Sequence, residues 1–292
     1  MPNLQTEIKV ISFEDSSSKL KFADFKGSTA LINRLVNDYV GFIKHPNAPI
    51  YREVNPPSYL MLHGPPGTGK SRVALTLVQE CEANHILLTT KDFASSDLAT
   101  RIGRIFEIAS ENSTCIVIFE ECESILSKDK LASTTQFLNE WNTLEREEKR
   151  EVFLVALTNN PELLPDSLKD RFRFAYIGLP DVKARTELIE DKLEEPTIRH
   201  ALSPADIKRL VAATVRFSGR QIHALINEAI TINRNKALNN AKARKEDPTN
   251  LDPTQLVITM DDVDGALLHI RGLDEDANKT YEAAMSNLNK YA

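Results

Sequence analysis

The chain has 292 residues, enough for one large domain or two modest ones with a buried core. A formal net charge of −6 and a pI near 5.6 exclude an overall positive field that would draw it to nucleic acid or to an anionic membrane. No basic segment followed by an apolar core opens the chain, and no apolar run has the length that spans a bilayer. We therefore expect a cytoplasmic protein without membrane insertion.

Three cysteines, Cys81, Cys115 and Cys122, have no C-x-x-C spacing and cannot all pair with one another. This pattern disfavours a disulfide scaffold or a structural zinc site. Buried free thiols in a reducing compartment are the simpler interpretation.

Short apolar runs alternate with helix-like segments along the first 180 residues. This rhythm is typical of a parallel α/β sheet flanked by helices. The expected strands, in chain order, are Tyr59 to Leu62, His85 to Leu88, Cys115 to Phe119, Val152 to Leu157 and Phe174 to Ile177.

Beyond Leu179 the strand-like runs stop and helical periodicity takes over. Ser218 is placed to cap a helix whose apolar residues share one face, namely Ile222, Leu225, Ile226, Ala229 and Ile230. The polar, proline-containing segment 245–255 is expected to be a loop, and segments 258–270 and 274–292 look helical. We divide the chain into an N-terminal extension (1–21), an α/β domain (22–180) and a helical domain (181–292).

The segment HGPPGTGKS, directly after the first expected strand, fits the pattern G-x-x-x-x-G-K-[ST] and precedes a helix-like segment. In this context, backbone N–H groups and the helix N-terminus surround phosphate oxygens, Lys70 reaches the β and γ phosphates, and the Ser71 hydroxyl binds Mg²⁺. A plain glycine-rich turn is the alternative, and the strand before the loop disfavours it. The predicted nucleotide contacts are Gly64, Pro65, Pro66, Gly67, Thr68, Gly69, Lys70 and Ser71.

A second signal is the run IVIFEECE, in which four apolar residues lead straight into carboxylates. A buried central strand that ends beside the glycine loop would bring Glu120 to the metal ion and Glu121 to the γ-phosphate. The alternative is a solvated helix start, because carboxylates favour first helical turns.

These motifs resemble those of the AAA ATPases. GPPGTGKS, IVIFEE, VFLVALTNNPELLPDSLKDRF and RFSGRQIHALINEAI are similar to the Walker A, Walker B, sensor 1 with arginine finger, and sensor 2 segments, in the family's order. The resemblance covers about residues 22 to 292 and implies a P-loop NTPase fold with a five-stranded parallel sheet and a small all-helical lid. It also implies hydrolysis of ATP with Mg²⁺ and self-association into a ring, expected to be a hexamer. The tail 273–292 resembles the extra terminal helix of the katanin, spastin and vacuolar-sorting branch.

The resemblance also implies roles for single residues. Glu121 would orient the attacking water, and Asn159 would be the sensor 1 residue that holds that water and reads the γ-phosphate, although an Asn before a proline-containing loop also fits a turn. Arg171 would be the arginine finger that one subunit gives to its neighbour, against the alternative of a lone surface arginine. Arg220 would reach phosphate in its own subunit, unless it is only an exposed first-turn arginine.

The opening FADFKG is similar to the family's entry segment, which often contacts adenine. Asp24 and Gly27 stand at matching positions there.

Two departures from the family pattern, at Glu120 and in the pore segment, stand beside an unusual order of the arginines. Glu120 replaces the usual Asp of the Walker B strand, which adds a methylene between the backbone and the carboxylate. Arg173 follows Arg171, where members often carry a second arginine before it, so a two-arginine clamp is disfavoured. The segment KDFASSDLA replaces a longer pore loop and has no Trp or Tyr; Phe93, its only aromatic residue, aligns better with a buried position.

Together these features predict an ATPase that acts as a ring-forming remodeller of protein complexes, with other copies of itself and a protein of unspecified identity as partners. The altered pore segment keeps open a nucleotide-dependent assembly or scaffold switch that threads no polypeptide. A DNA-directed ATPase of the clamp-loader or initiator kind is a third candidate, which the acidic charge balance disfavours.

Overall fold

The computed structural model describes residues 8–15, 21–25, 29–52, 59–93, 98–112, 114–147, 151–247, 251–253 and 256–271. Its centre is a sheet of parallel strands in the order β2-β3-β4-β1-β5. The predicted parallel sheet is therefore confirmed, and each strand lies within one residue of its expected bounds. The strands are β1 (Tyr59–His63), β2 (Asn84–Leu88), β3 (Cys115–Phe119), β4 (Val152–Thr158) and β5 (Arg173–Tyr176).

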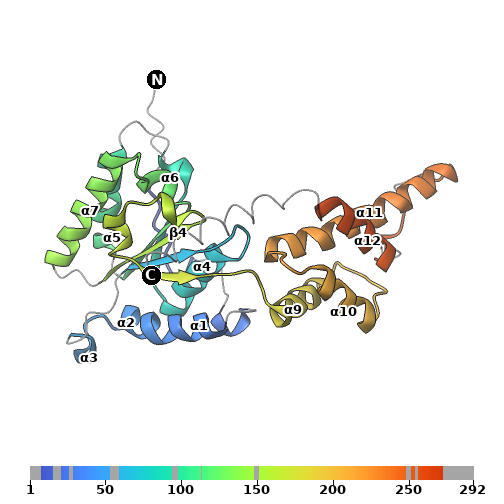
Figure 1. Ribbon diagram of the computed structural model, residues 1–292, viewed down its shortest axis with the longest axis horizontal. Helices are drawn as coiled ribbons and strands as arrows, with labels where there is room; N and C mark the ends of the chain where they lie inside the picture. The colour runs from blue at the N-terminus through green and yellow to red at the C-terminus, as the bar shows by residue number, and fades with distance from the viewer. Residues whose placement is uncertain are drawn as a thin grey trace, which may run out of the picture.

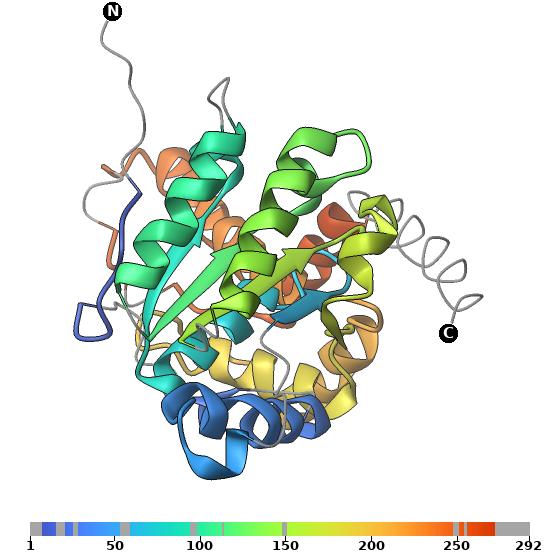
Figure 2. The ribbon, with the colours of Figure 1, turned by 90° about the vertical axis from the view of Figure 1, so that its left-hand side faces the viewer.

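Both faces of the sheet are covered, so β3 and β4 are buried along their whole length and are apolar except for Thr158. In β3, Val117 and Phe119 pack into one hydrophobic core, and Ile116 and Ile118 pack into the core on the opposite face. Figure 2 shows the sheet between its two helical layers. The cysteines are buried and free, as the sequence indicated.

One helical layer belongs to the first core and the other to the second. The first layer consists of α5 (Leu98–Glu111), α6 (Glu123–Leu126) and α7 (Leu131–Arg146). The second consists of α1 (Thr29–Leu35), the π-helical turn η2 (Val36–Val40), α2 (Gly41–Lys44) and α4 (Lys70–Cys81). Shorter helical segments connect these elements, namely η1 (Phe22–Asp24), α3 (Pro49–Arg52), η3 (Thr90–Phe93), η4 (Pro161–Leu163) and α8 (Asp166–Lys169).

Four helices after β5 form a separate bundle, which we call the lid (Figure 1). They are α9 (Val182–Leu193), α10 (Pro204–Ala213), α11 (Gly219–Ala243) and α12 (Met260–Arg271). The predicted cap of α11 is present, because the Ser218 hydroxyl accepts from the Gln221 N–H while the Gln221 side chain accepts from the Ser218 N–H. Ile222, Leu225 and Ile226 are buried in the core of the lid.

The start of the chain attaches to the edge of the sheet. Ile11 and His85 exchange two backbone hydrogen bonds of 2.9 Å, which adds a short antiparallel bridge beside β2. Ile8 and Val10 pack against the core on the α5 side. This segment thereby covers part of an otherwise open strand edge.

Candidate functional site

The glycine loop lies between β1 and α4. Gly64 has φ +152°, and a Cβ there would lie 2.0 Å from the carbonyl oxygen of Ile177, so a side chain would collide with the segment after β5. The Thr68 hydroxyl donates to the Pro65 carbonyl at 2.9 Å and tightens the turn. Because α4 begins at Lys70, the free N–H groups of its first turn face the loop, which is the arrangement that binds anions.

Lys70 is held inside this loop. Its Nζ donates to the carbonyls of Gly64 and Pro65, both at 2.8 Å, and its side chain is buried. Burial lowers the pKa of Lys70 to about 8; Glu123 acts in the opposite direction, and Arg220 lowers the pKa further. The loop therefore holds an ammonium group whose charge lacks full solvation, and phosphate oxygens would stabilise that charge.

Glu120 and Glu121 follow the end of β3, at the edge of the sheet where the loop lies. The Glu120 N–H donates to the Leu88 carbonyl at 2.8 Å, and the Cys122 N–H donates to the Leu157 carbonyl at 3.0 Å. These two bonds fix the backbone of Glu121 in the left-handed region, at φ +49°, which costs about 1–2 kcal/mol for a residue with a side chain. Glu121 is exposed and Glu120 half-buried.

The structure brings most of the predicted catalytic set into one pocket of about 460 Å³. Four segments contribute to it: the glycine loop with the start of α4, the end of β3, the end of β4 and the first turn of α11. Its lining residues are Pro66, Gly67, Gly69, Lys70, Ser71, Arg72, Glu120, Glu121, Leu157, Thr158, Asn159 and Arg220.

Glu123 is a residue of this region that the sequence analysis missed. Its Oε1 accepts the backbone N–H of Asn159 at 3.2 Å, while its Oε2 is buried without a hydrogen-bond partner. The negative charge of Glu123 also raises the pKa of Lys70, against the effect of burial. The sequence shows Glu123 as the third carboxylate of EECE. Its contact with Asn159 could not be predicted, because it depends on where α6 begins.

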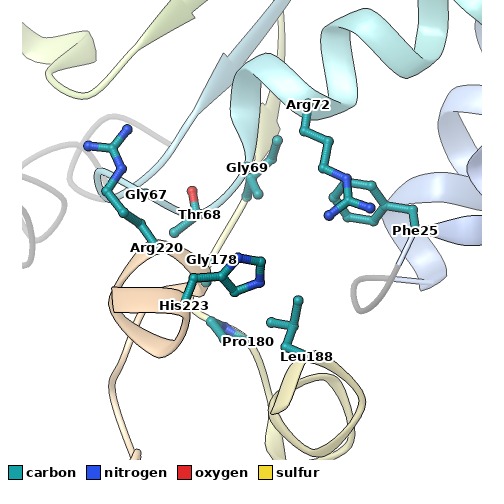
Figure 3. A pocket seen from close by; sticks show the side chains of 12 residues that line it. Phe25, Gly67, Thr68, Gly69, Arg72, Gly178, Pro180, Leu188, Arg220 and His223 are labelled. Carbon is teal, nitrogen blue, oxygen red and sulfur yellow. The ribbon is translucent and has the colours of Figure 1, made fainter. Parts of the chain in front are cut away.

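Arg220 connects the lid to the loop. Its backbone N–H donates to the Gly67 carbonyl at 3.2 Å, and its side chain is exposed at the pocket that Lys70 and Glu121 line. Figure 3 shows its guanidinium pointing away from Phe25.

A second cavity, of about 200 Å³, adjoins the glycine loop on its other side (Figure 3). Its walls include Phe25, Ile177, Pro180, Leu188 and His223, which come from the entry segment, the segment after β5, and the lid helices α9 and α11. Burial is the main cause that lowers the pKa of His223. This largely apolar cavity beside the glycine loop has the chemistry of a nucleobase site.

Arg72 closes one end of this cavity. Its guanidinium lies over the Phe25 ring, with Cζ 5.8 Å from the ring centroid. The expected base contacts were Asp24 and Gly27, and no signal in the sequence marked Phe25, Arg72 or His223. Asp24 belongs to η1, but its side chain and the whole of Gly27 lie outside the described residues.

Arg171 lies away from both cavities, in the turn between α8 and β5. Its Nη1 donates to Asn142 Oδ1 at 2.6 Å, and its Cζ lies 5.6 Å from the centroid of the Trp141 ring. Arg173 forms an ion pair with Asp38 at 3.3 Å. The two arginines after α8 therefore have different surroundings.

Comparison with known proteins identifies the family to which this α/β domain is similar. Residues 60–178 match the ATPase family associated with various cellular activities (AAA), a segment that begins within β1 and ends just after β5. The chain contains an AAA ATPase domain. The AAA match thus includes the glycine loop, both acidic residues, Asn159 and Arg171.

The chain is 29% identical over 210 residues to the cell division cycle protein 48 homolog of Archaeoglobus fulgidus. That alignment covers 67% of this chain and 28% of the relative, so the chain spans less than a third of that protein. The solved FIGL-1 AAA domain in complex with ADP superposes with a TM-score of 0.77 at 22% identity, covering 96% of this chain and 92% of that one. A katanin structure that addresses self-assembly gives 0.69 at 23% identity, with 89% and 87% covered.

The AAA domain offers oxygen donors that suit Mg²⁺. Ser71 is exposed at the start of α4, and Glu120 lines the same pocket. In the described part of the chain, no cluster of three or more His, Cys, Asp or Glu side chains could hold a metal alone. Mg²⁺ is commonly bound by one or two protein oxygens together with substrate phosphates and water, so this donor set fits it. None of the helices within the described ranges is long and apolar enough to cross a membrane.

Proposed function

We propose that this chain binds ATP with Mg²⁺ and hydrolyses it to ADP and phosphate at an interface between two copies of itself. The supporting observation is that Arg171 and the other predicted catalytic residues lie at opposite edges of the sheet. Glu121 and Asn159 follow the ends of β3 and β4, at the carboxyl edge with Lys70, whereas Arg171 precedes β5 at the amino edge. A strand of this length spans roughly 13 Å, so Arg171 is out of position for its own site and suits a neighbour's.

Each residue has a role in the proposed reaction. Lys70 binds the β and γ phosphates, and Glu121 holds the attacking water and accepts its hydrogen bond from the side opposite the leaving group. Asn159 contacts the γ-phosphate and the water. Arg171 of a second copy stabilises the charge that grows on the transferred phosphoryl group. Bound Mg²⁺, held by Ser71 and by Glu120 directly or through water, would neutralise phosphate charge.

The base would occupy the cavity of Phe25 and His223. Because this cavity and the phosphate pocket share Gly67, Gly69, Arg72 and Arg220, one nucleotide can extend across both. Arg220 belongs to the lid and also lines the phosphate pocket, so it is the residue that would couple lid position to bound phosphate.

The chain would assemble as a ring, with six copies as the expected number, and remodel protein complexes. Similarity to a katanin structure that concerns self-assembly supports association between copies. The position of Arg171 before β5, outside the pocket of Lys70, also supports association, since a single copy would then lack the proposed finger. The domain division at residue 180 and the terminal helix at 273–292, which lies outside the described residues, remain predictions.

A nucleotide-dependent assembly switch is the second candidate. Phe93 is 7% exposed and its ring stacks on Phe119, with centroids 6.2 Å apart, so this aromatic residue belongs to the core and cannot grip a threaded polypeptide. Adding a tagged model protein and ATP separates the candidates. Unfolding of the tagged protein would favour remodelling, and nucleotide-dependent assembly without unfolding would favour the switch.

The shared active site is tested with two inactive variants. Lys70→Ala removes the phosphate contact but keeps the finger, and Arg171→Ala removes the finger but keeps the phosphate contact. Neither variant alone should hydrolyse ATP at more than a trace rate, while mixed oligomers should recover part of the activity because intact Arg171 then faces intact Lys70. Mixed oligomers without recovery would contradict the proposal.

A further inference from the structure

Arg171 rests on two neighbouring residues near the end of α7. Trp141 presents its ring to the guanidinium at 5.6 Å, and Asn142 accepts a hydrogen bond from Nη1 at 2.6 Å. Exposed arginines on protein surfaces usually sample many rotamers. Here a flat ring and an amide oxygen contact the same guanidinium from two directions, so a single orientation is favoured.

The backbone of Arg171 is fixed as well. Its N–H donates to the Leu168 carbonyl at 3.1 Å. Phe172, the next residue, is 6% exposed, and its ring packs edge-to-face on Trp141 with centroids 5.2 Å apart. The indole Nε1 donates to Glu145 at 2.8 Å, which holds the indole in place. Trp141 therefore anchors both the side chain of Arg171 and the chain segment that carries it.

We propose that Trp141 and Asn142 are positioning residues that orient Arg171 toward the ATP site of a neighbouring copy; this inference rests on the proposed function. A guanidinium has five N–H donors in a plane, and Asn142 accepts from one. The remaining donors stay available for a phosphate. Trp141 and Asn142, which we call the seat of Arg171, therefore orient the guanidinium without occupying all of its donors. A finger that is already oriented loses less freedom when it meets the transition state, and turnover rises accordingly.

Arg173 shows what a different arrangement looks like. It pairs with a carboxylate, Asp38, at 3.3 Å, and a carboxylate competes directly with phosphate for a guanidinium. Arg171 has a neutral amide and an aromatic face as partners instead. Neutral partners leave its full positive charge available to an anion, which is what a finger requires.

The decisive experiment places Asn142→Ala in defined subunits of mixed oligomers. Asn142 is exposed on a helix, and alanine favours helix, so the variant should fold; Asn139→Ala removes the same side chain from an exposed position one turn earlier and serves as the control. In mixtures of Lys70→Ala and Arg171→Ala, Asn142→Ala should lower the recovered rate about tenfold when the Lys70→Ala subunit carries it. It should have no effect when the Arg171→Ala subunit carries it, because that subunit provides no finger.

The outcomes separate the two proposals. Recovery that falls equally whichever subunit carries Asn142→Ala would overturn the positioning role and leave the shared active site intact. Absence of recovery in every mixture would overturn the shared active site, and the positioning role with it. In homo-oligomers, Asn142→Ala should lower kcat and leave KM for ATP unchanged, whereas a loss confined to KM would contradict the inference.

A spectroscopic readout tests the seat itself. Trp141 is the single tryptophan of the chain, so its emission reports on this place alone. Arg171→Ala and Asn142→Ala should both shift that emission, and Asn139→Ala should leave it as in the wild type. Identical spectra for the wild type and Arg171→Ala would mean that the guanidinium does not occupy the seat in solution, which overturns the inference.

Discussion

The backbone N–H of Arg220 donates to the carbonyl oxygen of Gly67 at 3.2 Å, so the first turn of lid helix α11 contacts the glycine loop directly. A Cβ on Gly67 would lie 2.8 Å from Ser218 Oγ and 2.9 Å from Arg220 Cβ. Ser218 is the residue that caps α11. This contact between lid and loop therefore requires a glycine at position 67, because any side chain there would collide with α11.

Gly67→Ala should weaken nucleotide binding by roughly tenfold or more, because the new methyl group collides with α11 and φ +76° is unfavourable for alanine. Gly103→Ala is the control, since Gly103 lines neither cavity and the atom nearest to its Cβ would be the end of the Glu140 side chain, at 3.2 Å. Calorimetric titration with ADP measures the affinity. Amide exchange at Arg220 should accelerate only in Gly67→Ala, and unchanged exchange there would contradict the role of this contact.

The sequence predicted the sheet well because burial on both faces leaves a local signal. The runs around Ile116 and Leu154 are apolar without interruption and short, which is typical of a central parallel strand. The glycine loop was equally predictable, since Gly64 and Lys70 belong to a motif with a fixed spacing in the sequence. Both features depend on residues that are close together in the sequence, so a single sequence is enough to predict them.

The rest of the candidate site depends on contacts between distant segments. His223 reaches the cavity of Phe25 only because the lid packs beside the loop, and nothing in the periodicity of α11 marks it. Asn142 and Arg171 are 29 positions apart, and their hydrogen bond follows from where α7 and α8 end. Single-sequence patterns carry no information of that kind.

Phe25→Ala should weaken ADP binding by about tenfold, because the variant loses the aromatic wall of the proposed base cavity. Inorganic pyrophosphate serves as the control ligand, since it has no base to contact that wall. Its affinity should stay unchanged in the variant. Equal losses for ADP and pyrophosphate would show that Phe25 acts on the phosphate loop and not on a base.

Glu123→Ala should lower turnover by roughly tenfold, because the Asn159 N–H loses its acceptor and the loop after β4 becomes free to move. Glu123→Gln should retain most of the activity, because its amide oxygen can accept the hydrogen bond from the Asn159 N–H in place of Oε1. Steady-state phosphate release compares the two variants. If Gln were as damaging as Ala, the charge of Glu123 near Lys70 would be the important property, and the hydrogen bond would be secondary.

Glu120 stands where the family usually has an aspartate, so its side chain is one methylene longer. Mg²⁺ requires short oxygen contacts in near-octahedral geometry, so a glutamate in place of the family's aspartate would crowd an ion that it bound directly. Mg²⁺ also retains several waters, and a shift of one water layer can absorb the extra methylene. Glu120 is half-buried, and its backbone is tied to Leu88, which limits how far its carboxylate can retreat.

Glu120→Asp should therefore leave Mg²⁺-dependent hydrolysis unchanged or raise it by a few-fold, and Glu120→Ala should reduce it by about two orders of magnitude. Glu121→Gln should keep ATP binding and stop turnover, because its exposed carboxylate is the one assigned to the water. Nucleotide titration and phosphate release, measured side by side across a Mg²⁺ series, check all three variants. The assignment reverses if Glu120→Gln traps bound ATP while Glu121→Gln turns over normally, since Glu120 would then orient the water itself.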